Sequence, residues 1–171
     1  VGTQVPVRDL LESMITRSSN LATNALIEIV GAQKANATAH ALGAKNIRVL
    51  RGVEDNKAFD KGMNNTTTSR DLAVILAAIA QRRAASPKSC DEMVAILSRQ
   101  EFNDAIPAGL PPGTKVAHKT GNITAVQHDA AIVYPAAGRP YVLVVLTRNI
   151  PDEKVAKTLI ADLSRIVYEK R

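Results

Sequence analysis

The sequence has one cysteine, few aromatic residues and no long apolar run, and each of these shortages excludes a class of protein. Cys90 is the only cysteine among 171 residues, so no disulfide can form within the chain and cysteine usage does not indicate a redox compartment. The most apolar stretch, Tyr141 to Leu146, is far shorter than the roughly 18 residues of a membrane span and is typical of a buried strand. We therefore expect no membrane span.

Charge and composition indicate an ordinary globular protein. The chain is 46% hydrophobic and 22% charged, which is enough apolar material for a buried core. The net charge is +6, but aromatic residues make up 3% and the basic residues are scattered, so we expect a solvated basic surface and no nucleic-acid partner. The chain begins at Val1 without a methionine or a basic-then-apolar leader, and we expect processing or truncation upstream of it.

The first part of the chain has helical periodicity. Apolar residues recur at helix spacing from Val7 onward, and Gly31 and Gly43 mark helix ends. Periodicity fades at about 51–67, a segment too long to be only a connection. Thr68 and Asp71 then resemble a capping box, and Ser86 with Pro87 opens another helix that ends near Gln100.

After the breaker cluster at 107–113 the pattern changes to that of strands. Three strands are predicted at 115–120, 126–134 and 139–147, the last two joined as a hairpin, and an amphipathic helix follows at 152–168. The prediction is an α+β fold with an all-helical lobe, residues 1–110 with an Ω-like loop at about 51–67, and a second lobe, residues 111–171. In that lobe a C-terminal helix covers an antiparallel three-stranded meander. A site at the junction is the default expectation.

Two short motifs carry the candidate chemistry. Ser18-Ser19-Asn20 lies between two predicted helices, where such side chains usually cap the next helix, and Lys119-Thr120-Gly121 ends a predicted strand, where the glycine would serve a bend. Together with 14–24, 65–68 and 129–135, these motifs resemble the S-D-N and K-T-G regions of class A β-lactamases, in the same order. The resemblance covers essentially the whole chain and implies an incomplete β-lactamase/transpeptidase-like fold.

The resemblance also implies roles for individual residues. Ser18 would relay a proton to the leaving nitrogen, and Asn20 would hydrogen-bond the substrate and a catalytic lysine. Lys119 and Thr120, with Gly121, would bind the substrate carboxylate, and Lys119 would also tune Ser18. These roles suit the chemistry, because a leaving nitrogen needs a proton and an anionic substrate needs a fixed cation and hydroxyl donors.

The sequence departs from the family pattern in three places. The attacking serine belongs to an S-x-x-K motif, none of the serines here is followed by lysine at that spacing, and we expect the motif upstream of Val1. The helix that carries that serine is central to the family's helical lobe, so we expect a cavity or a rearrangement in its place. The loop glutamate of the family has one candidate, Glu54, whose flanking residues do not match, so a solvated carboxylate is an equal alternative. Ser19 replaces the usual aspartate, at a position expected to matter less for the substrate.

Other polar residues near the strand motif have simpler interpretations. His118 and His128 have no further ligands at metal spacing, so structural or surface roles are expected for them. Asp129 is expected to pin the hairpin locally rather than to act in catalysis.

The sequence predicts part of a serine β-lactamase-type hydrolase that works through an acyl-serine intermediate and needs no metal or organic cofactor. The alternatives are a D-Ala-D-Ala peptidase of the penicillin-binding type and a non-catalytic binding module on the same scaffold. A small β-lactam or a peptidoglycan-like molecule is the expected partner. Association through an open sheet edge, or with the missing N-terminal segment, is a further expectation. By resemblance, the protein would act in the periplasm or outside the cell.

Overall fold

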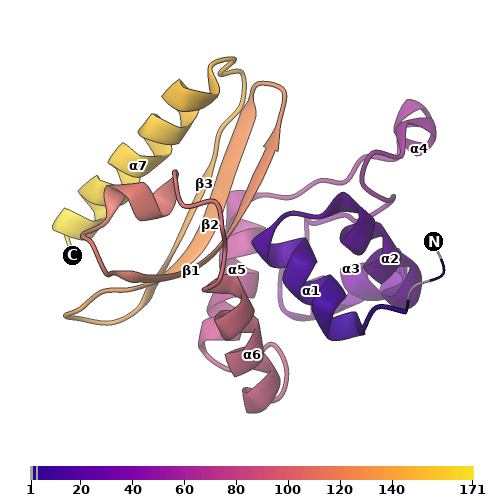
Figure 1. The fold of residues 1–171 in the computed structure, drawn as a ribbon, viewed down its shortest axis with the longest axis horizontal. Helices are drawn as coiled ribbons and strands as arrows, with labels where there is room; N and C mark the ends of the chain where they lie inside the picture. The colour runs from indigo at the N-terminus through magenta and orange to yellow at the C-terminus, as the bar shows by residue number, and fades with distance from the viewer. Residues whose placement is uncertain (1, 3) are drawn as a thin grey trace.

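The computed structural model describes residue 2 and residues 4–171, which form a group of helices beside a small sheet (Figure 1). The elements in chain order are α1 (Val7–Thr16), α2 (Asn20–Val30), α3 (Ala32–Ala41), α4 (Asn56–Asp60), α5 (Ser69–Ala80), α6 (Pro87–Leu97), the 3-10 helix η1 (Ile106–Gly109), β1 (Lys115–Ile123), β2 (Val126–Tyr134), β3 (Tyr141–Leu146) and α7 (Glu153–Glu169). No helix of the described residues is long and apolar enough to cross a membrane.

Helices α2, α5 and α6 begin where hydroxyl side chains accept free backbone N–H groups. Ser19 accepts from Ala22 at the start of α2, Thr68 accepts from Asp71 at the start of α5, and Ser86 accepts from Ser89 at the start of α6. These bonds satisfy donors that have no partner within the helix. In the part of the chain that the structure describes, Asp71 does not complete the capping box, because its buried carboxylate accepts from the backbone N–H of Asn46, 2.9 Å away.

The sheet is an antiparallel meander in the order β1-β2-β3. Alternation along β2 divides its side chains between two cores. Ala130 and Ile132 join Ala117 of β1 in a cluster with residues of α5 and α6, whereas Ala131 and Val133 face Ile106 of η1 and Ile160 of α7. The sheet is therefore covered on both faces.

The layers fix the position of the candidate site. Helices α5 and α6 pack on one face of the sheet, and α7 with η1 packs on the other, while α1 to α3 lie to the side (Figure 1). Helix α1 contacts both α2 and α6, so the loop between α1 and α2 is held beside the sheet. The α+β arrangement predicted from the sequence is confirmed.

Two local predictions are corrected. The segment at 51–67 contains the short helix α4, which Asp55 starts by accepting from the N–H of Ala58, 3.0 Å away. Gly121 is not at a bend, because β1 continues to Ile123 and Gly121 pairs with His128 of β2. Without a side chain, Gly121 leaves the strand surface low beside Lys119 and Thr120.

The helices leave an apolar surface uncovered between them. An apolar cavity of about 680 Å³ lies between α1, α5 and α6 and is lined mainly by aliphatic side chains, among them Leu11, Ile15, Ile75, Met93 and Leu97. The outer edge of β3 also has no partner strand among the described residues. Both features leave apolar or hydrogen-bonding surface uncovered.

The close packing of η1 on α7 supports a test of the second core. A Cβ at Gly109 would lie 1.9 Å from the carbonyl oxygen of Ala161, which belongs to the rigid backbone of α7. We expect Gly109→Ala to lower the free energy of unfolding by about 2 kcal/mol or more, because overpacking must displace the helix. Urea unfolding measures the loss. Gly121→Ala is the control, since the nearest atom there is 4.0 Å away; an equal loss in both variants would contradict this account.

Candidate active site

The centre of the site is a contact between a loop of the helices and a strand of the sheet. Ser18 lies between α1 and α2 with a positive φ of 54°, a conformation that non-glycine residues seldom adopt without support from their surroundings. The Lys119 ammonium on β1 donates to the Ser18 hydroxyl and to the carbonyl oxygen of Thr120. The expected approach of the two motifs is therefore present for Ser18 and Lys119.

Lys119 is held in a partly buried position. Its neighbour on β2 is Ala130, so its side chain extends from the face of the sheet that carries α5 and α6. Burial lowers the pKa of the Lys119 ammonium, and the negative charge of Asp129 opposes this decrease. A desolvated ammonium attracts an anion more strongly than one in water does, which suits the binding of a carboxylate.

Asn20 extends the site in the other direction. Its side-chain amide donates to the Glu54 carboxylate at 2.9 Å, and no bond from Asn20 to Lys119 or Thr120 is present in the described residues. Glu54, like Ser18, has a positive φ, of 62°. Asn20 and Ser18, from one end of α2, therefore connect the 51–67 segment to β1.

The segment that carries Glu54 is fixed by asparagine side chains. Asn24, one turn after Asn20 on α2, accepts from the N–H of Val53 at 2.6 Å and donates to its carbonyl oxygen at 3.0 Å. Asn65 accepts from the N–H groups of Leu50 and Arg51 and donates to the carbonyl oxygen of Arg51. A Cβ at Gly52 would lie 2.8 Å from the Asn24 oxygen, so a larger residue there would displace the Asn24 side chain that bonds to Val53. Glu54 is therefore presented by a braced backbone.

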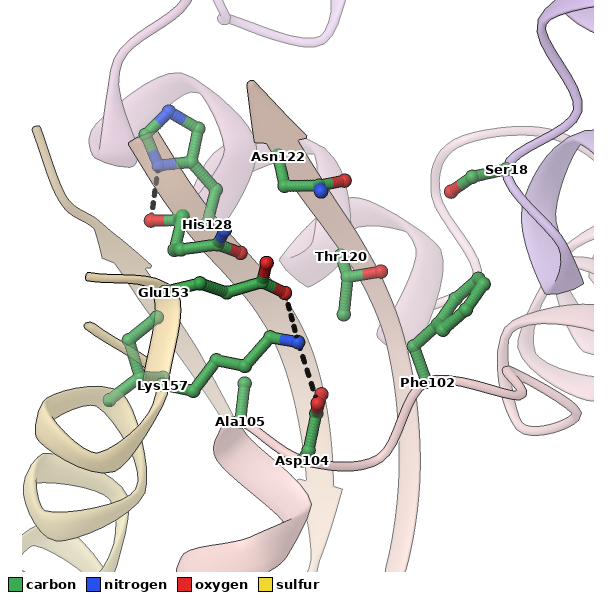
Figure 2. A pocket seen from close by; sticks show the side chains of 11 residues that line it. Ser18, Phe102, Asp104, Ala105, Thr120, Asn122, His128, Glu153 and Lys157 are labelled. Atoms are coloured by element: carbon green, nitrogen blue, oxygen red, sulfur yellow. Dashed lines mark hydrogen bonds and ion pairs between the residues drawn. The ribbon is translucent and has the colours of Figure 1, made fainter. Parts of the chain in front are cut away.

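A pocket of about 150 Å³ opens beside β1 on the side of α7. Figure 2 shows Thr120 and Asn122 facing it from β1, with Ser18 and Phe102 nearby. Thr120 and Lys119 are consecutive residues of an edge strand, so they lie on opposite faces of the sheet, and a ligand along that edge can reach both.

The opposite wall of this pocket is a charged cluster. Lys157 of α7 pairs with Glu153 one turn earlier and with Asp104, at 2.7 Å, in the loop before η1 (Figure 2). These two carboxylates raise the pKa of the Lys157 ammonium. The cluster joins the loop before η1 to α7 and closes the end of the pocket.

Sequence reasoning missed several of these residues. Glu153 and Lys157 are four residues apart on a predicted helix, so the sequence predicts that they form an ion pair. Nothing in the sequence predicts that this pair lies beside the pocket. Asn24 lies in the 14–24 segment that resembles the family, but its two hydrogen bonds to Val53 depend on the fold of the 51–67 segment. Asp104 and Asn122 carry no signal. Among the described residues, no group of three or more His, Cys, Asp or Glu side chains is arranged to hold a metal ion.

Comparisons with known proteins agree with this architecture. A model of the β-lactamase enzyme family matches residues 1–170. The chain is 28% identical to a β-lactamase of Bacillus licheniformis over 99% of its own length and 57% of that protein, and 29% identical to β-lactamase AST-1 of Nocardia asteroides, with 99% and 56% covered. It thus spans little more than half the length of these relatives.

Solved structures give the same result. The structure of PBP-A is similar with a TM-score of 0.89 and 34% identity, covering 98% of this chain and 62% of that one. A β-lactamase from Sphaerobacter thermophilus superposes with a TM-score of 0.91 and 31% identity, covering 99% and 64%.

The Asn24 brace gives a prediction for the loop. Asn24→Ala leaves the N–H and carbonyl groups of Val53 without protein partners, and we expect a loss of about 1 to 2 kcal/mol with faster amide exchange at Val53 and Glu54. Hydrogen exchange measured by NMR tests this. Asn36→Ala is the matched control, because Asn36 makes the same two bonds to Val49. Unchanged protection at Val53 in Asn24→Ala would show that the brace does not hold the loop.

Proposed function

Because the chain belongs to the β-lactamase enzyme family, we propose that it is part of a serine hydrolase that cleaves a β-lactam amide through an acyl-serine intermediate. The contact between Lys119 and Ser18 carries this proposal. It brings a partly buried ammonium, a hydroxyl and the free edge of a strand together at one place. We also propose that the intact protein acts in the periplasm or outside the cell, as the resemblance implies.

The proton relay follows from the hydrogen bonds of Ser18. A hydroxyl has one proton to donate and two lone pairs. Since Ser18 accepts from Lys119, its own proton stays free to point into the cleft, toward the nitrogen that leaves when the amide breaks. The Lys119 ammonium stabilises the oxygen as this proton departs, and the proton that the attacking serine gives up replaces it, so that Ser18 ends as a hydroxyl.

Substrate binding follows from the edge of β1. In the proposal, Lys119 supplies the cation and Thr120 a hydroxyl for the substrate carboxylate, and Gly121 leaves room for the ligand beside the strand. Asn20 keeps its side-chain oxygen available, because its bond to Glu54 uses the amide nitrogen. That oxygen is free for the substrate or for a lysine.

We assign the nucleophile to a segment upstream of Val1. No serine of this chain is followed by lysine three residues later, and the cavity between α1, α5 and α6 has an apolar lining that the apolar face of an added segment could cover. The open edge of β3 would accept a strand of the same segment. An occupied cavity and a paired edge would remove both uncovered surfaces.

Glu54 is the proposed base for the water that releases the acyl group. Its carboxylate accepts from Asn20 with one oxygen, which leaves the other free to hold a water. The brace between Asn24 and Val53 holds the adjacent backbone.

The first test uses the 171-residue chain with a chromogenic β-lactam. We expect no acyl adduct by intact-mass spectrometry, because loss of a serine nucleophile costs about 10⁶-fold in rate. Adding the upstream segment, covalently or as a peptide, should bring acylation back. In the restored protein, Lys119→Ala should lower acylation by about 10²-fold or more, whereas Lys115→Ala, on the same strand but exposed, should not. A stoichiometric adduct on the bare chain would place the nucleophile elsewhere.

The second test distinguishes an enzyme that releases the acyl group by hydrolysis from one that, like a penicillin-binding peptidase, keeps it as a long-lived acyl adduct. In the restored protein, Glu54→Gln keeps an oxygen for Asn20 but cannot take a proton from water, so acylation should persist while release slows by about 10² to 10⁴-fold. The lifetime of the adduct in mass spectra measures this. If Glu54→Gln releases the acyl group as fast as the unmodified protein, Glu54 is not the base. A long-lived adduct in both would favour the D-Ala-D-Ala peptidase alternative.

A further inference from the structure

A buried pair of ionisable side chains lies directly behind the strand that carries Lys119. His118 on β1 is 1% exposed and Asp129 on β2 is fully buried, and the His118 Nδ1 lies 3.0 Å from the Asp129 Oδ1. The pair faces η1 and the loop before it, on the side of the sheet opposite Lys119. The function proposed above uses neither residue.

The hydrogen bonds around the pair determine where protons must be. The amide nitrogen of Asn103 donates to the carbonyl oxygens of Gln100 and Glu101, which orients the Asn103 Oδ1 toward the His118 Nε2, 3.2 Å away. An amide oxygen only accepts, so Nε2 carries a proton. The Asp129 Oδ2 accepts from the backbone N–H of Ile106 at 3.0 Å.

The second proton follows from the contact between the two side chains. The distance between Nδ1 and Oδ1 requires a proton between them, since two lone pairs would otherwise meet in a buried place. An imidazole is a stronger base than a carboxylate, so that proton belongs on the ring. Every polar atom of the pair then has a partner, which is the condition for a buried ion pair to persist.

We propose that His118 is an imidazolium in the folded protein and is a positioning residue that balances the charge of Asp129, so that the charge of Lys119 remains available for an anionic ligand. The assignment of the anion to a substrate carboxylate rests on the proposed function. The protonation of His118 does not.

The need for this balance comes from the position of Asp129. Its negative charge acts on Lys119, where it raises the pKa of the ammonium. An uncompensated carboxylate there would act on Lys119 through the sheet by its charge alone, and would reduce the attraction of the ammonium for a bound carboxylate. With His118 charged, the pair is neutral as a unit and also fastens the 100–106 loop to the sheet.

The direct test is an NMR spectrum of the unmodified chain labelled with ¹⁵N-histidine. We expect both ring nitrogens of His118 to carry a proton near neutral pH, and His118→Gln identifies the signals by their loss. A ring with one proton would overturn the proposal. This measurement needs no ligand, so it stands apart from any failure of the proposed function.

The charge balance is tested through Lys119 in the same chain. His118→Gln keeps an N–H donor but leaves Asp129 uncompensated, and the midpoint for titration of the Lys119 ε-carbon signal should rise by on the order of one pH unit. The double variant His118→Gln with Asp129→Asn should return it to near the original value. An unchanged midpoint in His118→Gln would overturn the proposal. If His118→Gln does not fold, the double variant decides between the two causes. A neutral amide pair should restore folding if the unbalanced charge of Asp129 caused the loss. A purely steric role for His118 predicts that the double variant also fails to fold.

Discussion

The candidate site depends on the bond that the Lys119 ammonium donates to Ser18. This bond joins the loop between α1 and α2 to the sheet, and because the Ser18 oxygen accepts in it, the bond does not use the proton of the Ser18 hydroxyl. Lys119 is desolvated, which lowers the pKa of its ammonium, yet it still has oxygen partners. A partly buried cation that is incompletely satisfied is poised to bind an anion.

The rest of the structure holds the two ends of this bond in place. Ser19 caps α2 and so sets the position of Ser18, while close pairing of β1 with β2 fixes Lys119. On the other side of α2, Asn20 and Asn24 connect the helix to the loop of Glu54. The start of one helix is therefore hydrogen-bonded to the Glu54 carboxylate through Asn20 and lies next to the bond between Ser18 and Lys119.

Much of the fold was accessible from the sequence because hydrophobic period and turn residues determine it locally. The change from helical to strand periodicity near residue 113 and the Ser86-Pro87 start were predicted correctly. The prediction of a bend at Gly121 was wrong. The sequence does not distinguish a glycine that bends a strand from one that leaves space beside a continuous strand. The short helix α4 was missed because it depends on a single Asp55 cap.

The site itself was only partly accessible. Ser18, Asn20, Lys119 and Glu54 were proposed from motif resemblance, and the fold places Ser18 against Lys119 and Asn20 against Glu54. Asp104 came from a loop whose course is set by tertiary contacts alone, so no local pattern could reveal it. The loop brace and the charged wall of the pocket both arise from contacts between segments far apart in the chain, which periodicity does not encode.

The most direct test of this account is an NMR measurement of the Lys119 ammonium in ¹⁵N-lysine-labelled chain. An ammonium held by Ser18 and the Thr120 carbonyl should exchange its protons with water slowly enough to be observed in cool, mildly acidic solution, unlike the exposed lysines. Ser18→Ala should accelerate that exchange and shift the signal. If the Lys119 signal has the same position and exchange rate in Ser18→Ala, the two groups do not form the bond on which the site depends.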